Sequence, residues 1–382
     1  MSLGAAHEDT PGVRRAWAWV GHLRAGGTTA WRDWATEGEA RGRILPGAQQ
    51  LELLRRLNEA GRPSADLTAR VLDASAPGRG RPDLELVGVI DHAAFGPPPV
   101  DPADLPDDEL IRVATSVLAD DVVAAGLPRT RRRTPLQRPW RTRYRLVGDP
   151  WVADPVRAEL IRRGRPPGGR GCVVLVVGRA VDAMVVDAWT HRSLTEGGPD
   201  WGDWLDSVTH QPGLPPRVDV LGHARRWSDR IGTPRVQVVL DPALLPGLTG
   251  TRKPLPAPLE LSADATDLAR RTAAVLGLLV VPSKREALLR DTLRPRLAAD
   301  DGPPLVVPPE HAEWLRRRAT RMRAQLLRAG YAVHGDPDAL LPRDRPGVTA
   351  PADAGVLALA LRLLLEGDRD GRGPQRDGGE TA

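Results

Sequence analysis

Cysteine is almost absent from the sequence, and this scarcity excludes several classes of protein. Cys172 is the only cysteine among 382 residues, so the chain can have neither a disulfide framework nor a zinc site built from several cysteines. It falls in an apolar run, where we expect a buried, inert thiol. The histidines show no metal-ligand spacing, so we expect no metal cofactor.

Long apolar runs are also missing. No run approaches the ~20 residues that a membrane-spanning helix needs, and the N-terminal MSLGAAHEDTPGVRR lacks the apolar core of a secretory signal. We therefore expect a cytoplasmic protein with no membrane partner.

Lysine is also scarce, since Lys253 and Lys284 are the only lysines among 54 basic residues. An arginine excess beside 39 Gly and 38 Pro is what a GC-rich coding sequence produces, so the net charge of +5 does not predict a nucleic-acid partner. Arginines do cluster between Arg129 and Arg145 with no acidic residue among them. This stretch is either a solvated basic linker or a site that attracts phosphate or sulfate.

The stretch from Arg143 to Arg192 alternates between strand and helix signals. It reads as two strands, each followed by a turn and a helix, with the first helix opening at Pro155: Tyr144 to Val147, Pro155 to Ile161, Cys172 to Val177 and Val181 to Trp189. The second strand is a continuous apolar run, as in a parallel sheet that is covered on both faces. Ligands of such sheets lie at the carboxyl ends of the strands, here near Gly148 to Asp154 and Gly178 to Asp182.

The remaining pattern predicts an α/β protein, with a three-layer parallel sheet flanked by helices, right-handed crossovers and an N-terminal helical extension. A further strand is expected at Leu84 to Ile90. The expected domains are residues 1–76 (helical partial repeat), 77–142 (strand, Pro-rich loop, helix and Arg-rich connector), 143–342 (α/β core), 343–366 (C-terminal helix) and 367–382 (disordered tail).

An internal repeat appears when the chain is shifted against itself by 170 residues. The shift aligns Trp19, Trp31 and Trp34 with Trp189, Trp201 and Trp204. Each copy predicts a helix, a Gly turn, a W-x-D-W element and a second long helix. The tryptophans either form aromatic platforms that stack a base or sugar or anchor the helices in the core.

The order of these features resembles the sulfotransferase-like proteins of high-GC bacteria, relatives of enzymes that use 3′-phosphoadenosine 5′-phosphosulfate (PAPS). Gly148, Asp149 and Pro150 are similar to the start of the family's G-x-P-K-T-G-T-T loop, and Arg179 is similar to its 3′-phosphate-binding arginine. The loop is degenerate, because residues 151–155 read WVADP where the family has Lys, Thr and Gly. The family's partner serine is also missing from the helix Val181 to Trp189.

The resemblance implies PAPS or 3′-phosphoadenosine 5′-phosphate as cofactor. Gly148, Asp149, Pro150 and Arg179 would then bind the nucleotide, helped by Arg143 and Arg145 in the basic stretch. A sulfuryl transfer needs a base that takes the acceptor's proton, and His191 is the nearest candidate.

Two hypotheses follow from the sequence. The chain is a sulfotransferase-like protein that either transfers a sulfuryl group to an unknown acceptor or only binds an adenosine phosphate. Alternatively, it is a non-catalytic scaffold whose repeated Trp helices and Arg-rich connector hold a protein or polyanionic partner.

Overall fold

A computed structural model of the chain describes residues 10–39, 42, 44–75, 81–89, 97–128, 144–168 and 171–371. The chain forms two compact units, and each is assembled from separate stretches of sequence. The first comprises Met1–Leu127, Arg271–Arg296 and Ala352–Ala382, and the second comprises Pro128–Arg270 and Leu297–Pro351. The C-terminal helix therefore belongs with the N-terminal helices, where the sequence suggested a continuous series of domains.

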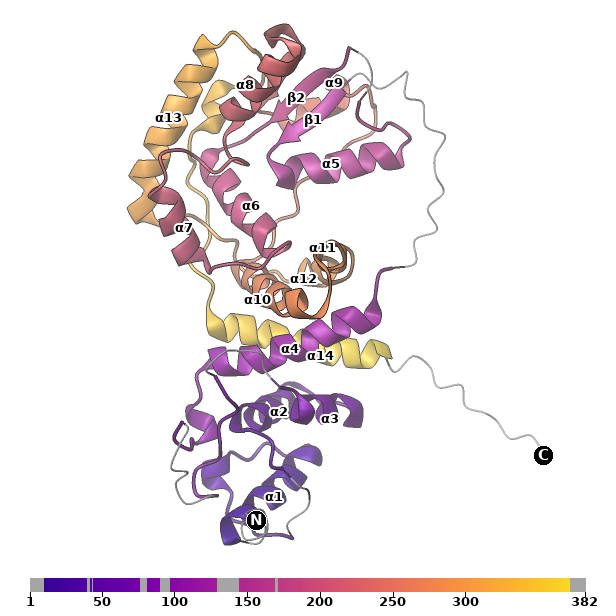
Figure 1. The fold of residues 1–382 in the computed structure, drawn as a ribbon, viewed down its shortest axis with the longest axis vertical. Coiled ribbons are helices and arrows are strands. Elements are labelled where there is room, and N and C mark those ends of the chain that lie inside the picture. Colours follow the sequence, from indigo (N-terminus) through magenta and orange to yellow (C-terminus); the bar gives the residue numbers. More distant parts are fainter. Residues whose placement is uncertain are drawn as a thin grey trace, which may run out of the picture. The chain divides into compact units, whose positions relative to one another are not determined.

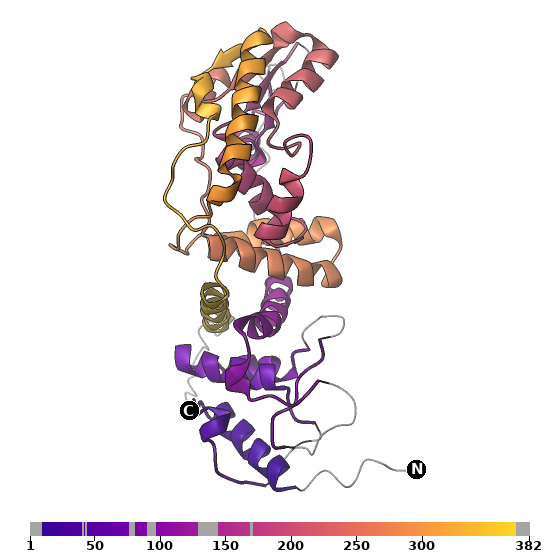
Figure 2. The same ribbon diagram turned by 90° about the vertical axis from the view of Figure 1, so that its left-hand side faces the viewer.

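The first unit is helical. Its elements are α1 (Pro11–Arg24), η1 (Trp31–Asp33), α2 (Ala48–Ala60), α3 (Ala65–Asp73), η2 (Pro102–Asp104), α4 (Asp107–Ala125), α11 (Pro282–Leu288), the π-helical η6 (Leu289–Leu293) and α14 (Asp353–Gly371). Helix α14 lies beside α4, and each contributes buried leucines (Figures 1 and 2).

Two expectations for this unit are wrong. The described part of the stretch expected to form a strand at Leu84 to Ile90 makes only a single bridge, between Leu86 and Val100. Helix α14 continues to Gly371, so the helix does not end before residue 367. The rest of the expected tail lies outside the described residues.

The second unit contains the expected parallel sheet. Its strands are β1 (Tyr144–Gly148), β2 (Val173–Val177), β3 (Val236–Val239) and β4 (Ala332–His334), in the order β1-β2-β3-β4. Leu146 pairs with Leu175 and Val176 pairs with Val238. Strand β4 was not expected, and Cys172 precedes β2 with a half-buried thiol, which corrects its predicted place within the strand.

Helices cover both faces of this sheet. The helices of the unit are α5 (Pro150–Arg162), α6 (Val181–Ser193), α7 (Trp201–Thr209), α8 (Val220–Ile231), α9 (Leu245–Leu248) and α13 (Ala312–Arg328), with short 3₁₀ turns at η4 (Thr233–Arg235), η5 (Pro242–Leu244), η7 (Pro309–His311) and η8 (Pro337–Leu340). Helices α10 (Ala263–Leu279) and α12 (Arg294–Leu297) each contain residues of both units. Helix α5 packs on the face of Leu146 and Leu175, while α8 and α13 pack on the face of Val174 and Val236 (Figure 1).

This arrangement corrects the expected handedness. The connection from β1 to β2 runs through α5 on one face, and the connection from β2 to β3 runs through α8 on the other. Because the strands step in one direction across the sheet, the two crossovers have opposite hands, and the usual right-handed rule does not hold for both.

The structure preserves the repeat in both units. Trp19 and Trp31 lie 5.3 Å apart between ring centroids, and the equivalent Trp189 and Trp201 lie 5.4 Å apart. All four rings are at most 2% exposed. These rings are therefore core anchors, and the interpretation of them as stacking platforms is wrong.

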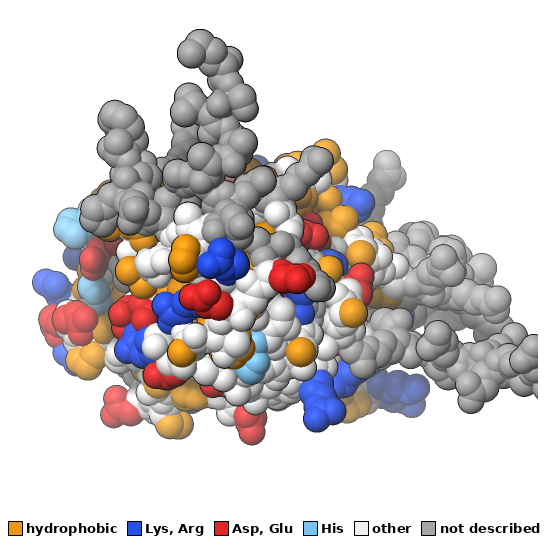
Figure 3. Space-filling model, turned by 90° about the horizontal axis from the view of Figure 1, so that it is seen from below, with side chains coloured by type: hydrophobic (Ala, Val, Ile, Leu, Met, Phe, Trp, Pro, Cys, Tyr) orange, Lys and Arg blue, Asp and Glu red, His pale blue; other side chains and the backbone are white. Residues whose placement is uncertain are grey.

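Two features of the described residues bear on the expected membrane and polyanion partners. Each helix in the described part of the chain is too short or too polar to cross a lipid bilayer. On the face drawn in Figure 3, Arg and Lys side chains are interspersed with Asp and Glu. The Arg-rich connector at Arg129 to Arg143 lies outside the described residues.

Candidate functional site

The carboxyl end of β1 places Asp149 at the start of α5. Gly148 has a φ of 108°, and a Cβ there would stand 2.1 Å from the carbonyl oxygen of Val177, so only glycine lets β1 approach β2 so closely. Asp149 is 1% exposed, and its Oδ1 accepts the amide of Trp151 at 3.0 Å. With this cap and Pro150 in the first turn, α5 begins five residues before the expected Pro155.

Arg179 lies at the corresponding end of β2 and joins two carboxylates. Its Nε donates to Oδ2 of Asp149 at 3.2 Å, and another of its nitrogens donates to Oδ2 of Asp187 on α6. The arginine side chain is 19% exposed, against 1% for Asp149 and 9% for Asp187. The three residues form a nearly buried acid–arginine–acid cluster.

The cluster holds more negative than positive charge, and this shifts its titration. Burial and the negative charge of Asp149 raise the pKa of Asp187 well above its usual value of 3.8. Burial also raises the pKa of Asp149, although Arg179 and a hydrogen bond from Asp187 oppose the shift. Both shifts follow from burying two carboxyl groups beside a single arginine, which disfavours the ionised form of each.

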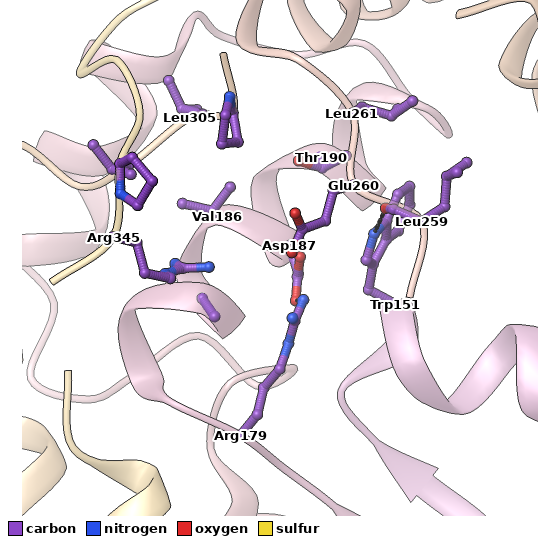
Figure 4. A pocket seen from close by; sticks show the side chains of 14 residues that line it. Trp151, Arg179, Val186, Asp187, Thr190, Leu259, Glu260, Leu261, Leu305 and Arg345 are labelled. Carbon is purple, nitrogen blue, oxygen red and sulfur yellow. Dashed lines mark hydrogen bonds and ion pairs between the residues drawn. The ribbon is translucent and has the colours of Figure 1, made fainter. Parts of the chain in front are cut away.

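A pocket opens beside the cluster, within the second unit (Figure 4). Helix α6 and Trp151 of α5 contribute walls, and three segments further along the chain, residues 259–261, 304–306 and 345–346, complete the lining. Its lining residues are Trp151, Arg179, Ala183, Val186, Asp187, Thr190, Leu259, Glu260, Leu261, Pro304, Leu305, Val306, Arg345 and Pro346. Because the connections after β1 and β2 leave on opposite faces, this end of the sheet is where a crevice is expected.

The pocket is small. Its volume is about 160 Å³, while one enclosed water takes about 10–15 Å³ on the same scale. It therefore has room for a ligand of roughly ten non-hydrogen atoms. The indole N–H of Trp151 donates to the carbonyl of Leu259, which fixes one wall.

A second arginine reaches the pocket from the opposite side. Arg345 donates from Nε at 3.2 Å and from a terminal nitrogen at 3.0 Å to the same Oδ2 of Asp182. Asp182 belongs to the first turn of α6. In Figure 4 the Arg345 guanidinium points towards the middle of the pocket.

The structure brings together only part of the site that the sequence predicts. Asp149 and Arg179 meet at the crevice, beside Gly148 and Pro150. Arg145 lies 5.8 Å from the Trp227 ring, measured from its Cζ to the ring centroid, on the face that α8 covers. Arg143 lies outside the described residues.

His191 does not line the pocket. It follows Asp187 by one turn of α6, but its Nε2 lies 3.8 Å from Oδ2 of Asp154 and its ring lies 2.7 Å from a nitrogen of Arg217. Its ring therefore contacts α5 and the loop before α8 instead of a ligand.

Among the polar residues that line the pocket, Asp187, Thr190, Glu260 and Arg345 were not predicted as site residues. The position of Asp187 on the predicted helix that follows Arg179 could have indicated that it lies near the site. Glu260 and Arg345 come from irregular segments with no motif. In the described part of the chain, no group of three His, Cys, Asp or Glu side chains could hold a metal ion.

Comparison of the chain with protein-family models, with curated proteins and with solved structures finds no match.

Proposed function

We propose that this chain binds a small organic ligand in the crevice pocket and that Asp187 exchanges a proton with it. The observation that carries the proposal is the position of Asp187, a buried carboxyl group that lines the pocket and is held by Arg179. A carboxyl group with a raised pKa titrates closer to neutral pH, where a general acid or base is most effective.

The supporting geometry is that of a preorganised site. Arg179 holds the Asp187 side chain by an ion pair. Asp149 in turn holds Arg179, and the start of α5 sets the position of Asp149. Apolar side chains of Trp151, Leu259 and Leu305 line the same pocket as this carboxyl group. A few polar groups in a mainly apolar cavity are typical of small-molecule sites.

Ligand-observed NMR of the full chain with a fragment library of neutral, cationic, anionic and zwitterionic members tests the proposal. We expect bound fragments that are lost in Val186→Trp, because Val186 points into the pocket and a larger side chain would fill it. Asp187→Asn should keep the fold, checked by circular dichroism, and change the pH dependence of binding. If no fragment binds, or if fragments bind Val186→Trp equally well, the proposal is wrong.

An adenosine phosphate is the second candidate ligand, with PAPS as the sulfuryl donor. Two arginines, Arg179 and Arg345, line the pocket, and this favours an anionic group there. Against it, both arginines already pair with aspartates, and an adenosine phosphate has more than twice the roughly ten non-hydrogen atoms for which the pocket has room.

Calorimetric titration with 3′-phosphoadenosine 5′-phosphate separates the two candidates. Micromolar binding that weakens in Arg179→Ala and in Arg345→Ala, and that exceeds the binding of AMP, would support the nucleotide. Absence of binding by the folded protein would remove this second candidate.

A further inference from the structure

We infer that the ligand of the crevice pocket is a small zwitterion, an amino acid or a close analogue. Its carboxylate would bind Arg345, and its ammonium group would bind Asp187 and Glu260. This inference rests on the proposed function, because it specifies the ligand of the same pocket.

Arg345 is held in place at the pocket with one terminal nitrogen not used by Asp182. Its segment is tied to residues 304–306 by two backbone hydrogen bonds, from Val306 to Val348 at 2.9 Å and from Val348 to Pro304 at 3.0 Å. Gly347 has no room for a side chain, since a Cβ would lie 2.5 Å from the Pro304 carbonyl oxygen. Asp182 binds Nε and one terminal nitrogen of Arg345, which leaves the other terminal nitrogen for a ligand carboxylate.

The opposite side of the pocket has an excess of negative charge. Asp149, Asp187 and Glu260 stand there against the single charge of Arg179. In Figure 4 the side chain of Glu260 reaches towards Asp187 from the covering segment. This side of the pocket therefore favours a cationic ligand group. The Trp151 ring in the adjacent wall would also attract a cation.

The two charged sides bound a space of amino-acid size. The pocket volume of about 160 Å³ allows roughly ten non-hydrogen atoms, and the apolar walls at Leu261 and Leu305 leave room for a short side chain. A ligand with one charge of each sign complements both sides, whereas a pure anion would face the carboxyl groups.

The raised pKa of Asp187 gives this ligand a measurable signature. An ammonium group beside Asp187 favours its ionised form, so the pKa should fall on binding and a proton should be released. Arg179, Arg345, Asp182 and Glu260 are the other charged groups around the pocket.

The experiment is calorimetric titration of the full chain with the twenty common amino acids, followed by the N-acetyl and carboxamide forms of each binder. We expect at least one amino acid to bind and each blocked form to bind at least tenfold more weakly. Titration in two buffers of different ionisation enthalpy should show proton release, and Asp187→Asn should abolish that release.

Arg345→Gln should weaken the parent amino acid at least tenfold and leave the weak binding of its carboxamide unchanged. Arg343→Gln is the matched control, because Arg343 is exposed on the same segment and does not line the pocket; we expect no change from it. Circular dichroism would confirm that both variants are folded.

Three outcomes would overturn the inference. If no amino acid binds while other fragments bind in a manner sensitive to Val186→Trp, the ligand class is wrong but the proposed function stands. If the carboxamide binds as well as the amino acid, Arg345 does not recognise a carboxylate. If neither amino acids nor fragments bind, the proposed function falls with the inference.

Discussion

Arg179 donates from Nε to Oδ2 of Asp149 across 3.2 Å, so the turn after β2 holds the carboxylate that ends β1. A carboxylate at the start of α5 satisfies a free backbone amide and the positive end of the helix dipole. This is the position in which a phosphate commonly binds. The Asp149 carboxylate thus occupies the position where an anion would bind, and the neighbouring carboxyl group of Asp187 is the one that lines the pocket.

Removing the guanidinium should destabilise the protein strongly. Arg179→Met leaves Asp149 and Asp187 buried without their cation, and breaking such a buried pair costs about 3–5 kcal/mol. Urea unfolding at pH 7, followed by circular dichroism, measures the loss. Arg162→Met is the control, since Arg162 pairs with Glu159 at the surface, and it should leave stability unchanged.

Further substitutions in Arg179→Met test whether the loss of stability comes from unpaired carboxylates. If the cost arises from unpaired carboxylates, then adding Asp149→Asn and Asp187→Asn to Arg179→Met should recover much of it. A triple variant as unstable as Arg179→Met would show that the loss comes from packing instead.

Stability should also depend on pH through Asp187. Its folded-state pKa is raised well above 3.8, so the folded protein binds this proton more tightly than the unfolded chain does. The resulting stability is present below the ordinary aspartate pKa and is lost as pH rises through the raised value. Asp187→Asn cannot titrate, and we expect it to gain stability relative to the unmodified protein between pH 4 and pH 8.

Urea unfolding of both proteins across that range measures the difference. Asp154→Asn provides the contrast, because His191 and Arg157 outweigh burial and lower the pKa of Asp154. Its folded form therefore favours the charged state, so the unmodified protein should gain stability over Asp154→Asn as pH rises. Parallel curves for Asp187→Asn and the unmodified protein would contradict the raised pKa of Asp187.

Local sequence pattern predicts an element where it reports which faces of a segment are buried. The continuous apolar run at Val173–Val177, which forms a buried strand, is an example. The three residues of β4 are too short to show a period. Of the two prolines near α5, Pro155 was chosen as the opening residue, because the capping bond of Asp149 is invisible without coordinates.

The site was predictable only where it follows strand ends. Gly148 ends β1 and Asp149 follows it, while Arg179 lies two residues after β2. Parallel strands bring such residues together. Arg345 reaches the pocket from 163 residues beyond its partner Asp182, and no local pattern reports such a contact. For the same reason the return of α14 to the first unit could not be read from the order of elements.

Gly148 should tolerate no side chain. Gly148→Ala would force a residue with a Cβ to adopt a φ of 108° and would place that atom 2.1 Å from the Val177 carbonyl oxygen. Backbone strain of this kind costs about 1–3 kcal/mol, and the clash at the β1–β2 pairing adds to it. Thermal unfolding should show a clear drop for Gly148→Ala and little change for Gly213→Ala, which meets no atom within 4 Å.

The repeated tryptophans Trp19 and Trp189 should contribute strongly to stability. Trp19 donates its indole N–H to the carbonyl of Thr29 at 2.9 Å, and Trp189 donates to the carbonyl of Pro199 at 3.3 Å. Each bond joins residues that are ten positions apart, and the two bonds occupy equivalent places in the repeat. Because both rings are almost fully buried, Trp19→Ala and Trp189→Ala should each cost about 3–5 kcal/mol.

Trp227→Ala is the control, because Trp227 is only partly buried and should cost less. Trp189→Phe separates the two contributions to the cost. Phenylalanine retains most of the ring burial but leaves the Pro199 carbonyl without its donor, so a loss of about 1–3 kcal/mol is expected. If Trp189→Ala proved as mild as Trp227→Ala while ligand binding disappeared, the aromatic ring would act on a ligand after all, and its role as a core anchor would have to be abandoned.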